Sequence, residues 1–309
     1  MNHIYSIIFK NTFMQIGIDL GATKIESVVL DDNGEEVHRS REKSPQNYDE
    51  TLSAIQNIIK KLEKKFNKNF NVGVCHPGSI SNETGLLKNA HNSQWLNNKQ
   101  FQKDISKILN KSVFCENDAN CFALSEAFDG SAKNYKIVFG IILGSGCGGG
   151  LIVNKKILKG ANNLAGEWGH NELPGYGLLD DENDIDKTIE DYISGKGIEK
   201  IFHKKFNKKL TTQEIFSKAN EKNKKYKDFL NRFINRLARS LCLIINTIDP
   251  DAIVFGGGVS NEIFFLDQVK KETEKILGEK QINTAFLKPM YGDASGVRGA
   301  AILCRKINY

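Results

Sequence analysis

The stretch "MQIGIDLGATKIESVVLDDNGEEV" (residues 14–37) decides the fold, because it joins two apolar runs through one short glycine turn. The first run ends at Asp19, the turn contains Gly21, and a polar turn at residues 32–34 follows the second run. This order predicts a strand, a tight turn, a second strand and then a third strand in one hairpin sheet. It does not predict a single strand that opens directly into a helix.

The same pattern occurs a second time, in "KIVFGIILGSGCGGGLIVNKKIL" (136–158). The two copies of this pattern are separated along the sequence by about the length of one lobe. They indicate two lobes with the same arrangement of strands. We expect lobes over residues 14–115 and 116–293, with a C-terminal helix at about 294–307 that packs back on the first lobe. Residues 1–13 are expected to be a disordered leader, and either Met1 or Met14 could be the start.

Helical periodicity and short apolar runs alternate through the rest of the chain. The alternation predicts an α/β fold. The predicted helices cover 48–66, 99–109, 119–128, 186–194, 196–206, 211–219 and 224–247, and the predicted strands cover 70–78, 112–117 and 252–258.

Composition excludes several classes of protein. The 309 residues, 40% of them hydrophobic, can bury a large core, and the net charge of +6 comes from Lys- and Asn-rich runs typical of solvated helix faces rather than of a nucleic-acid surface. Six scattered cysteines without a CxxC pair indicate a reduced, cytoplasmic protein. No apolar run approaches the ~20 residues of a membrane span, and the N-terminus lacks the features of a signal peptide.

The turn "DLGATK" (19–24) offers groups that suit a phosphate. Gly21 leaves room for close approach, Thr23 supplies a hydroxyl, Lys24 supplies a positive charge, and Asp19 ends the strand. An ordinary hairpin turn is the alternative. The lysine follows too soon for a P-loop, and no helix follows it directly.

Two further glycine clusters follow strands. Bare amides in the second glycine turn could form an anion nest, and a third cluster precedes a helix expected to start at about residue 261. A flexible loop is the alternative for any one cluster, but three together predict one nucleotide across a cleft between the lobes. The residues concerned are Gly144, Ser145, Gly146, Gly257 and Gly258.

Two polar motifs each have two interpretations. In "CENDANCFALSEAF" (115–128), Asn117 or Asp118 could simply cap the following helix, or Asp118 could be a general base that takes a proton from a hydroxyl attacking phosphorus. In "AGEWGHNELPGYG" (165–177), Glu167 and His170 suggest half a metal site or a loop built around a tryptophan.

Several long motifs in register resemble the ROK family of sugar kinases and sugar-responsive repressors, from about residue 14 to 304. They are "IGIDLGATK", "HPGSISNETGLLKNAHNSQW", "ENDANCFALSEA", "ILGSGCGGGLIVNKKILKGANNLAGEWGHNELP", "IEDYISGKGI", "IDPDAIVFGGGVSN" and "GDASGVRGAA". Among the branches, the chain looks closest to bacterial fructokinases of the mannokinase-fructokinase type, while "NDANCFALSEA" is also similar to N-acetylglucosamine kinases.

The resemblance implies a two-lobed, actin-like and ribonuclease-H-like fold in which ATP and sugar meet in a central cleft. It makes Asp118 the base and implies that sugar hydroxyls bind Asn89, Asn117, Glu167, His170 and Glu190. It also places Asp19, Thr23 and Lys24 near the phosphates and Mg²⁺, Gly144 to Gly146 on the second phosphate side, and Gly257 with Gly258 beside the adenosine. A homodimer or higher homo-oligomer is implied as well.

One departure from the family is large. Many members follow the Gly-His with a cysteine-rich run that binds a structural zinc together with the histidine, but no cysteine lies between Cys147 and Cys242 here. Thr188 stands where the third thiolate would fall, and a tetrahedral site needs four N or S ligands. We therefore expect no structural zinc, and a loop that is either left looser or braced by packing of Trp168, Tyr176, Leu178 and Leu179.

Three functions remain as hypotheses. The leading one is an ATP-dependent hexose kinase, most of all a fructokinase; the alternative is an N-acetylhexosamine, glucose or mannose kinase, since specificity depends on residues 78–95 and 166–190. A sugar-responsive repressor is the third. Family repressors carry a DNA-binding domain ahead of the first glycine hairpin, where about 13 residues stand here.

Overall fold

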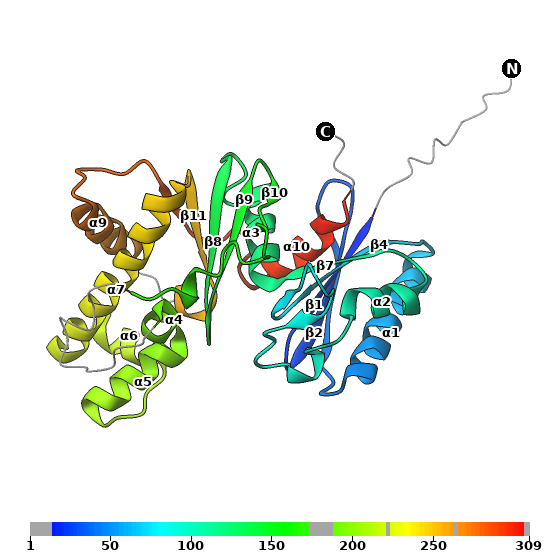
Figure 1. Ribbon diagram of the computed structural model, residues 1–309, viewed down its shortest axis with the longest axis horizontal. Coiled ribbons are helices and arrows are strands. Elements are labelled where there is room, and N and C mark those ends of the chain that lie inside the picture. The colour runs from blue at the N-terminus through cyan, green and yellow to red at the C-terminus, as the bar shows by residue number, and fades with distance from the viewer. Residues whose placement is uncertain (1–13, 174–187, 221–222, 262–264, 306–309) are drawn as a thin grey trace, which may run out of the picture. The chain divides into compact units, whose positions relative to one another are not determined.

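The computed structural model describes residues 14–173, 188–220, 223–261 and 265–305, and it consists of two compact units (Figure 1). Unit 1 contains Met1–Asp118 and Val297–Tyr309, and unit 2 contains Ala119–Gly296. The chain therefore passes from unit 1 to unit 2 once and returns once. None of the helices in the described ranges combines the length and apolar character that a membrane crossing requires.

Unit 1 is built on a five-stranded mixed sheet of order β3-β2-β1-β4-β7. β1 pairs antiparallel with β2, β2 antiparallel with β3, and β1, β4 and β7 run parallel. The hairpin predicted from the opening stretch is thus confirmed. The strands are β1 (Gln15–Leu20), β2 (Lys24–Leu30), β3 (Glu36–Lys43), β4 (Asn71–His76) and β7 (Val113–Asn117), and a small separate sheet pairs β5 (Ser79–Ile80) with β6 (Leu87–Lys88).

Helices cover both faces of the unit 1 sheet. α1 (Tyr48–Phe66) and α2 (Phe101–Leu109) bury their apolar sides with the isoleucines and valines of the strands in one core. The Asn47 side chain caps α1 by accepting hydrogen bonds from the second and third amides. α10 (Ser295–Leu303) lies on the opposite face, as Figure 1 shows. Gly73 permits this approach, since a β-carbon there would stand 1.8 Å from the Ala300 carbonyl oxygen.

Unit 2 repeats the plan with a sheet of order β10-β9-β8-β11-β12. β8, β9 and β10 form the antiparallel hairpins, and β8, β11 and β12 run parallel. The repeated glycine pattern therefore corresponds to a repeated sheet order. The strands are β8 (Ile137–Leu143), β9 (Cys147–Val153), β10 (Lys156–Ile157), β11 (Ala252–Gly256) and β12 (Ala285–Leu287).

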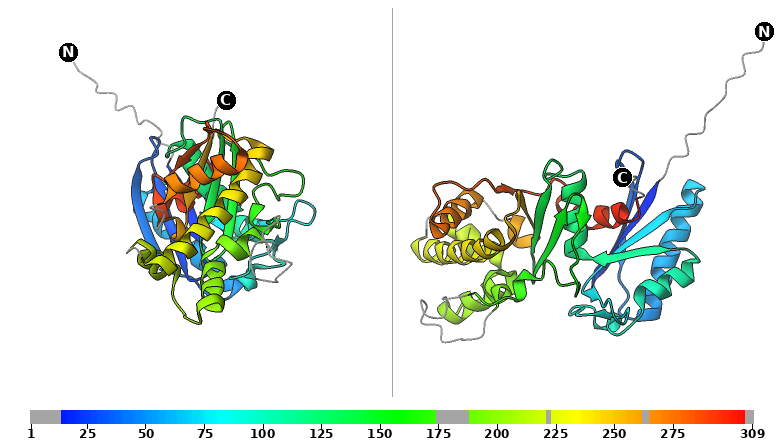
Figure 2. Two further views of the ribbon diagram at one scale, coloured as in Figure 1. Left: turned by 90° about the vertical axis from the view of Figure 1, so that its left-hand side faces the viewer. Right: turned by 45° about the horizontal axis from the view of Figure 1, so that its top comes forward.

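The helices of unit 2 divide between two faces of its sheet. α3 (Asp118–Phe128) packs on one face, where Gly140 and Gly150 of the sheet meet Ala123. The large core lies on the other face, and Figure 2 shows α7 and α9 there in yellow and orange. The remaining helices are α4 (Ile189–Ile193), α5 (Gly195–Phe206), α6 (Thr212–Asn220), α7 (Lys224–Ile248), α8 (Gly258–Asn261) and α9 (Leu266–Leu277).

A buried carboxylate ties α3 to the segment that precedes the return to unit 1. Glu126 is fully buried, and its two oxygens accept five hydrogen bonds. The donors are the Met290 and Tyr291 amides (2.9 and 3.2 Å), the Ser295 hydroxyl (2.7 Å), and the Ser131 amide and hydroxyl (2.9 and 3.1 Å). Glu126 therefore holds together, within unit 2, the helix after the first chain crossing and the residues before the second.

The predicted elements differ from the structure in several places. The helix expected at about residue 261 begins earlier, at Gly258, because the last glycine of the third cluster is already the first residue of α8. Asp118 is the first residue of α3 rather than a residue ahead of it. α9 and β12 were not predicted, and the helix expected over 186–194 is described only from its Thr188 cap onward.

Candidate active site

Asp19 lies near the carboxyl end of β1, where β1, β4 and β7 run parallel. Its Oδ1 is 3.2 Å from the Cys75 thiol, on the neighbouring strand β4. Burial raises the pKa of Asp19; the Cys75 hydrogen bond lowers it, the Glu26 carboxylate adds to the rise, and Lys24 and Arg41 oppose it. Ligands of open α/β sheets bind at the carboxyl ends of the parallel strands, so the Asp19 carboxylate lies where a ligand would bind.

The turn after Asp19 is held by its own backbone. The Gly21 amide donates to the Lys24 carbonyl over 2.9 Å, and the Thr23 carbonyl accepts from the Ser44 amide over 3.0 Å. A β-carbon on Gly21 would lie 3.0 Å from the Lys24 carbonyl oxygen, so the turn is tight. Thr23 is exposed, which leaves its hydroxyl open to a ligand.

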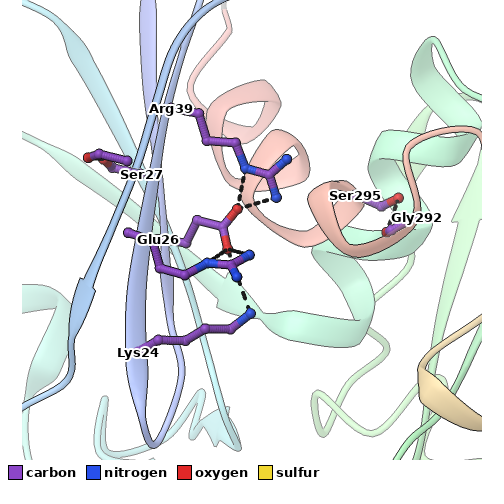
Figure 3. A network of polar contacts seen from close by, with 8 residues as sticks. Lys24, Glu26, Ser27, Arg39, Gly292 and Ser295 are labelled. Atoms are coloured by element: carbon purple, nitrogen blue, oxygen red, sulfur yellow. Dashed lines mark hydrogen bonds and ion pairs between the residues drawn. The ribbon is translucent and has the colours of Figure 1, made fainter.

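Lys24 belongs to a charged cluster on β2 and β3 (Figure 3). The buried Glu26 carboxylate accepts hydrogen bonds from Arg39 and, over 2.7 and 3.0 Å, from Arg41. The Lys24 ammonium is 3.8 Å from the same carboxylate. Three cations around one carboxylate leave net positive charge beside the Asp19 turn, which favours an anion there.

The polar residues at the end of β7 meet the small sheet of unit 1. The Asn117 side-chain amide donates to the Gly78 carbonyl over 3.0 Å. Gly78 has φ +77°, and a β-carbon there would stand 2.3 Å from the Lys88 carbonyl oxygen and 2.8 Å from the Ala90 amide nitrogen. These two residues flank Asn89, so the structure brings Asn117 and Asn89 to one place. Asp118 follows Asn117 directly, and its side chain is exposed.

Unit 2 contains a pocket of about 580 Å³ at the carboxyl ends of β8 and β11. This volume lies within the range of small-molecule sites. Three glycine-cluster residues that were predicted from the sequence line it, namely Gly144, Ser145 and Gly258. Gly146 and Gly257 are not lining residues of this pocket. The other lining residues are Gly195, Lys196, Glu199, Thr211, Thr212, Gln213 and Val259.

Most of the pocket wall was missed from the sequence. It comes from the start of α5 and the start of α6, where Thr212 donates its amide to Glu199 over 3.0 Å and its hydroxyl to the Gly195 carbonyl over 3.2 Å. The "SGKG" of residues 194–197 was the available signal, since Ser194 caps α5 through the Gly197 amide. Lys196 is exposed at this helix start and adds a positive charge to the pocket.

Gly257 brings the second and third glycine clusters together. It has φ +87°, and a β-carbon there would lie 2.4 Å from the Leu143 carbonyl oxygen at the end of β8. Because it has no side chain, Gly257 allows the turn after β11 to pack closely against the turn after β8.

Glu167 precedes a short 3-10 turn, Trp168–His170, and His170 is its last residue. Glu167 Oε2 is 3.5 Å from His170 Nδ1, and both side chains keep a third or more of their surface exposed. Trp168 is buried, and its indole donates to the Gly148 carbonyl of β9 over 3.2 Å. The tryptophan thus anchors the turn while the two polar groups face outward.

Glu190 lies close to the second glycine turn. Its Oε2 accepts a hydrogen bond from the Cys147 amide over 2.7 Å. Burial raises the pKa of the Cys147 thiol well above its usual range, and the Glu190 and Glu167 carboxylates raise it further. This environment favours the neutral thiol form of Cys147 over the thiolate.

The predicted site residues fall into two sets. Unit 1 contains the Asp19–Lys24 turn, Asn89, Asn117 and Asp118. Unit 2 contains the other predicted residues, which are Gly144, Ser145, Gly146, Glu167, His170, Glu190, Gly257 and Gly258.

The expected bracing of the loop after His170 is only partly described. Trp168 packs on Phe139 edge-on, at 6.2 Å between ring centroids. Tyr176, Leu178 and Leu179 lie outside the described residues. Within the described ranges, no three His, Cys, Asp or Glu side chains gather as metal ligands would.

The absence of a structural zinc stays a prediction with a direct measurement. We expect purified protein to contain far less than one zinc per chain, because His170 lacks the three thiolates of a tetrahedral site. Mass spectrometry of the metal content after exhaustive dialysis without chelator provides the test. About one zinc per chain, with loss of stability on chelation, would contradict it.

Comparisons with known proteins agree with this geometry. The model of the ROK family matches residues 15–307. An N-acetyl-D-glucosamine kinase from Mannheimia succiniciproducens is 38% identical over 301 residues, which cover 94% of this chain and 99% of that protein. A second N-acetyl-D-glucosamine kinase, from Histophilus somni, is 36% identical over 301 residues, 94% of this chain and 98% of that protein.

Solved structures share the fold at lower identity. The ROK hexokinase from Thermus thermophilus has a TM-score of 0.81 and 21% identity, with 94% of this chain and 98% of that chain covered. A ROK family glucokinase from Streptomyces griseus, solved with glucose and AMPPNP, has a TM-score of 0.76 and 24% identity, with 95% and 100% covered. The two-lobed, actin-like α/β fold predicted from the sequence is thus confirmed.

The repeated hairpin sheets and the family match along nearly the whole chain lead to one conclusion. The chain belongs to the ROK family and is a sugar kinase.

Proposed function

We propose that this protein is an ATP-dependent N-acetylglucosamine kinase, which transfers the γ-phosphoryl group to a hydroxyl of the amino sugar. The observation that carries the proposal is the similarity to N-acetyl-D-glucosamine kinases at 38% and 36% identity over 94% of the chain. The fructokinase expectation has less support, because neither of these relatives is a fructokinase. The alternative expectation of an N-acetylhexosamine kinase is the better supported of the two.

In this proposal, Asp118 is the general base. Its carboxylate is exposed at the start of α3, next to Asn117 and close to the segment that carries Asn89. It accepts the proton of the attacking sugar hydroxyl as the new O–P bond forms and the bond to the ADP leaving group breaks. The amides of Asn117 and Asn89 orient the sugar, since each offers both a donor and an acceptor to a hydroxyl.

Glu167, His170 and Glu190 complete the proposed sugar ligands. The pair Glu167 and His170 presents an acceptor and an imidazole on one exposed turn, 3.5 Å apart. A carboxylate accepts hydrogen bonds from two adjacent hydroxyls, so these groups suit a neutral polyol that must be bound without a charge.

The pocket of unit 2 is the proposed nucleotide site. Its volume, its glycine-lined wall and the Lys196 ammonium fit a nucleotide with anionic phosphates. On unit 1, the groups proposed to bind the phosphates are the Gly21 turn, Thr23 and Lys24. The carboxylate oxygens of Asp19 are the kind of ligand that Mg²⁺ prefers. Mg²⁺, when bound, would neutralise phosphate charge that develops during transfer.

A cytoplasmic location and a homodimer or higher homo-oligomer belong to the same proposal. The cysteines support the first, since all six are buried and form no disulfide, as in a reduced protein.

The test is a panel of sugars with the purified enzyme and Mg·ATP. We expect kcat/KM for N-acetylglucosamine to exceed that for fructose, glucose and mannose by at least about tenfold, because unpaired buried polar groups penalise a sugar that lacks the matching substituent. A coupled assay of ADP release measures each rate. A preference for fructose would restore the fructokinase hypothesis, and no activity with any hexose would contradict the proposal.

A further inference from the structure

Glu190 makes a contact that a sugar ligand does not need. It is the second residue of α4, whose start is held by Thr188 and Asp191, with the Asp191 carboxylate accepting from the Thr188 amide and hydroxyl over 3.1 and 3.0 Å. From there its Oε2 accepts from the Cys147 amide over 2.7 Å. Cys147 is the first residue of β9, directly after the second glycine turn.

The carboxylate also lies against the turn itself. A β-carbon on Gly146 would stand 2.8 Å from Glu190 Oε2. A hydrogen bond with an ionised acceptor is roughly twice as strong as a neutral one. The Glu190 carboxylate therefore restrains the carboxyl end of the glycine turn.

The same segment restrains the other end of the turn. The Gly195 amide donates to the Gly144 carbonyl over 2.8 Å, and the Ser194 amide donates to the Glu190 carbonyl over 3.0 Å. Residues 190–195 thus contact the turn at Gly144 and at Cys147. Within the turn, the Gly144 amide donates to the Gly146 carbonyl over 3.0 Å.

The turn forms one wall of the proposed nucleotide pocket. Gly144 and Ser145 line it directly, and Gly195 lines it from the segment that holds the turn. This wall of the pocket consists mainly of backbone, so its shape depends on the hydrogen bonds that hold the turn. These are the bond from the Cys147 amide to Glu190 and the bond from the Gly195 amide to the Gly144 carbonyl. Binding is stronger where the bound conformation is already in place, since less ordering is needed.

We propose that Glu190 is a positioning residue for the nucleotide, holding the turn at residues 144–147 in its binding conformation, in addition to its proposed contact with the sugar. Oε2 is engaged by the Cys147 amide, and the second carboxylate oxygen serves the sugar. The inference rests on the proposed nucleotide pocket of unit 2. Glu167 differs from Glu190 in this respect, because its turn contacts β9 through Trp168 rather than through its own carboxylate.

The test is the affinity for AMPPNP, measured by calorimetry with Mg²⁺ and without any sugar. Glu190→Ala removes the acceptor, and Glu190→Asp keeps the charge but shortens the reach; both are expected to weaken AMPPNP binding about tenfold, the size of one charge-assisted hydrogen bond. Glu190→Gln retains an oxygen that accepts from the Cys147 amide, and its affinity is expected to stay within about threefold of the wild type.

Glu167→Ala is the matched control, because it removes a proposed sugar ligand whose carboxylate, among the described residues, forms no hydrogen bond with the glycine turn. We expect it to raise KM for the sugar and to leave AMPPNP affinity unchanged, whereas Glu190→Ala raises KM for both sugar and ATP. Wild-type AMPPNP affinity in Glu190→Asp, or an equal loss in Glu167→Ala, would overturn the inference. Since no sugar is present in the binding assay, the result is independent of which sugar the enzyme phosphorylates.

Discussion

Replacing Asp118 by asparagine is expected to lower kcat by about a thousandfold, within the usual contribution of a general base. Asparagine is nearly isosteric and keeps one acceptor oxygen, but its amide does not take up the proton of the attacking hydroxyl. Sugar affinity should change little, because the exposed side chain at the start of α3 keeps its shape. Steady-state kinetics and sugar titration by calorimetry separate the two effects.

Asp49→Asn is the matched control. Asp49 is also exposed, belongs to unit 1 and lies in the first turn of a helix, but that helix is α1, which follows β3 rather than β7, and Asp49 is not one of the proposed site residues. We expect full activity from this variant. Undiminished turnover in Asp118→Asn would refute the assignment of the base, and equal losses in both variants would indicate a general effect of removing a helix-start carboxylate.

Glu126→Ala is expected to destabilise unit 2 by about 3 kcal/mol or more. The variant removes the buried acceptor of the Met290 and Tyr291 amides, whose hydrogen bonds are part-buried, and of the buried Ser295 hydroxyl, which keeps the Gly292 carbonyl as a second acceptor. Each unsatisfied buried group costs about 1–3 kcal/mol. The measurement is urea denaturation followed by circular dichroism and by tryptophan fluorescence, since Trp168 is buried in unit 2.

Glu63→Ala provides the comparison for this effect. Glu63 forms an ion pair with Lys111, and both side chains are nearly a quarter exposed. Partly solvated pairs of this kind contribute about 1 kcal/mol or less. Equal losses of stability in the two variants would show that Glu126 does not hold the segment around residues 290–295 in the way its hydrogen bonds indicate.

Local patterns in the sequence predicted the two hairpin sheets, because alternating β-branched runs and glycine turns specify neighbouring strands directly. The start of α3 was predicted within one residue, because the capping residues of "NDAN" are also a local signal. The wall of the unit 2 pocket was not predicted. It depends on contacts such as Thr212 with Gly195 and Glu190 with Cys147, between residues 17 and 43 positions apart. Such pairs follow from how helices pack on a sheet, which no short motif encodes.

The place of α10 has a consequence for the order in which the chain folds during its synthesis on the ribosome. The unit 1 sheet is made first, but one of its faces is covered by a helix that begins at Ser295, at the end of unit 2 in the sequence. All of unit 2, Ala119–Gly296, emerges before that helix is complete. Although domains generally fold in the order of synthesis, the unit 1 sheet here cannot bury both faces until all of unit 2 has been synthesised, which leaves the nascent chain with exposed apolar surface that a chaperone could recognise.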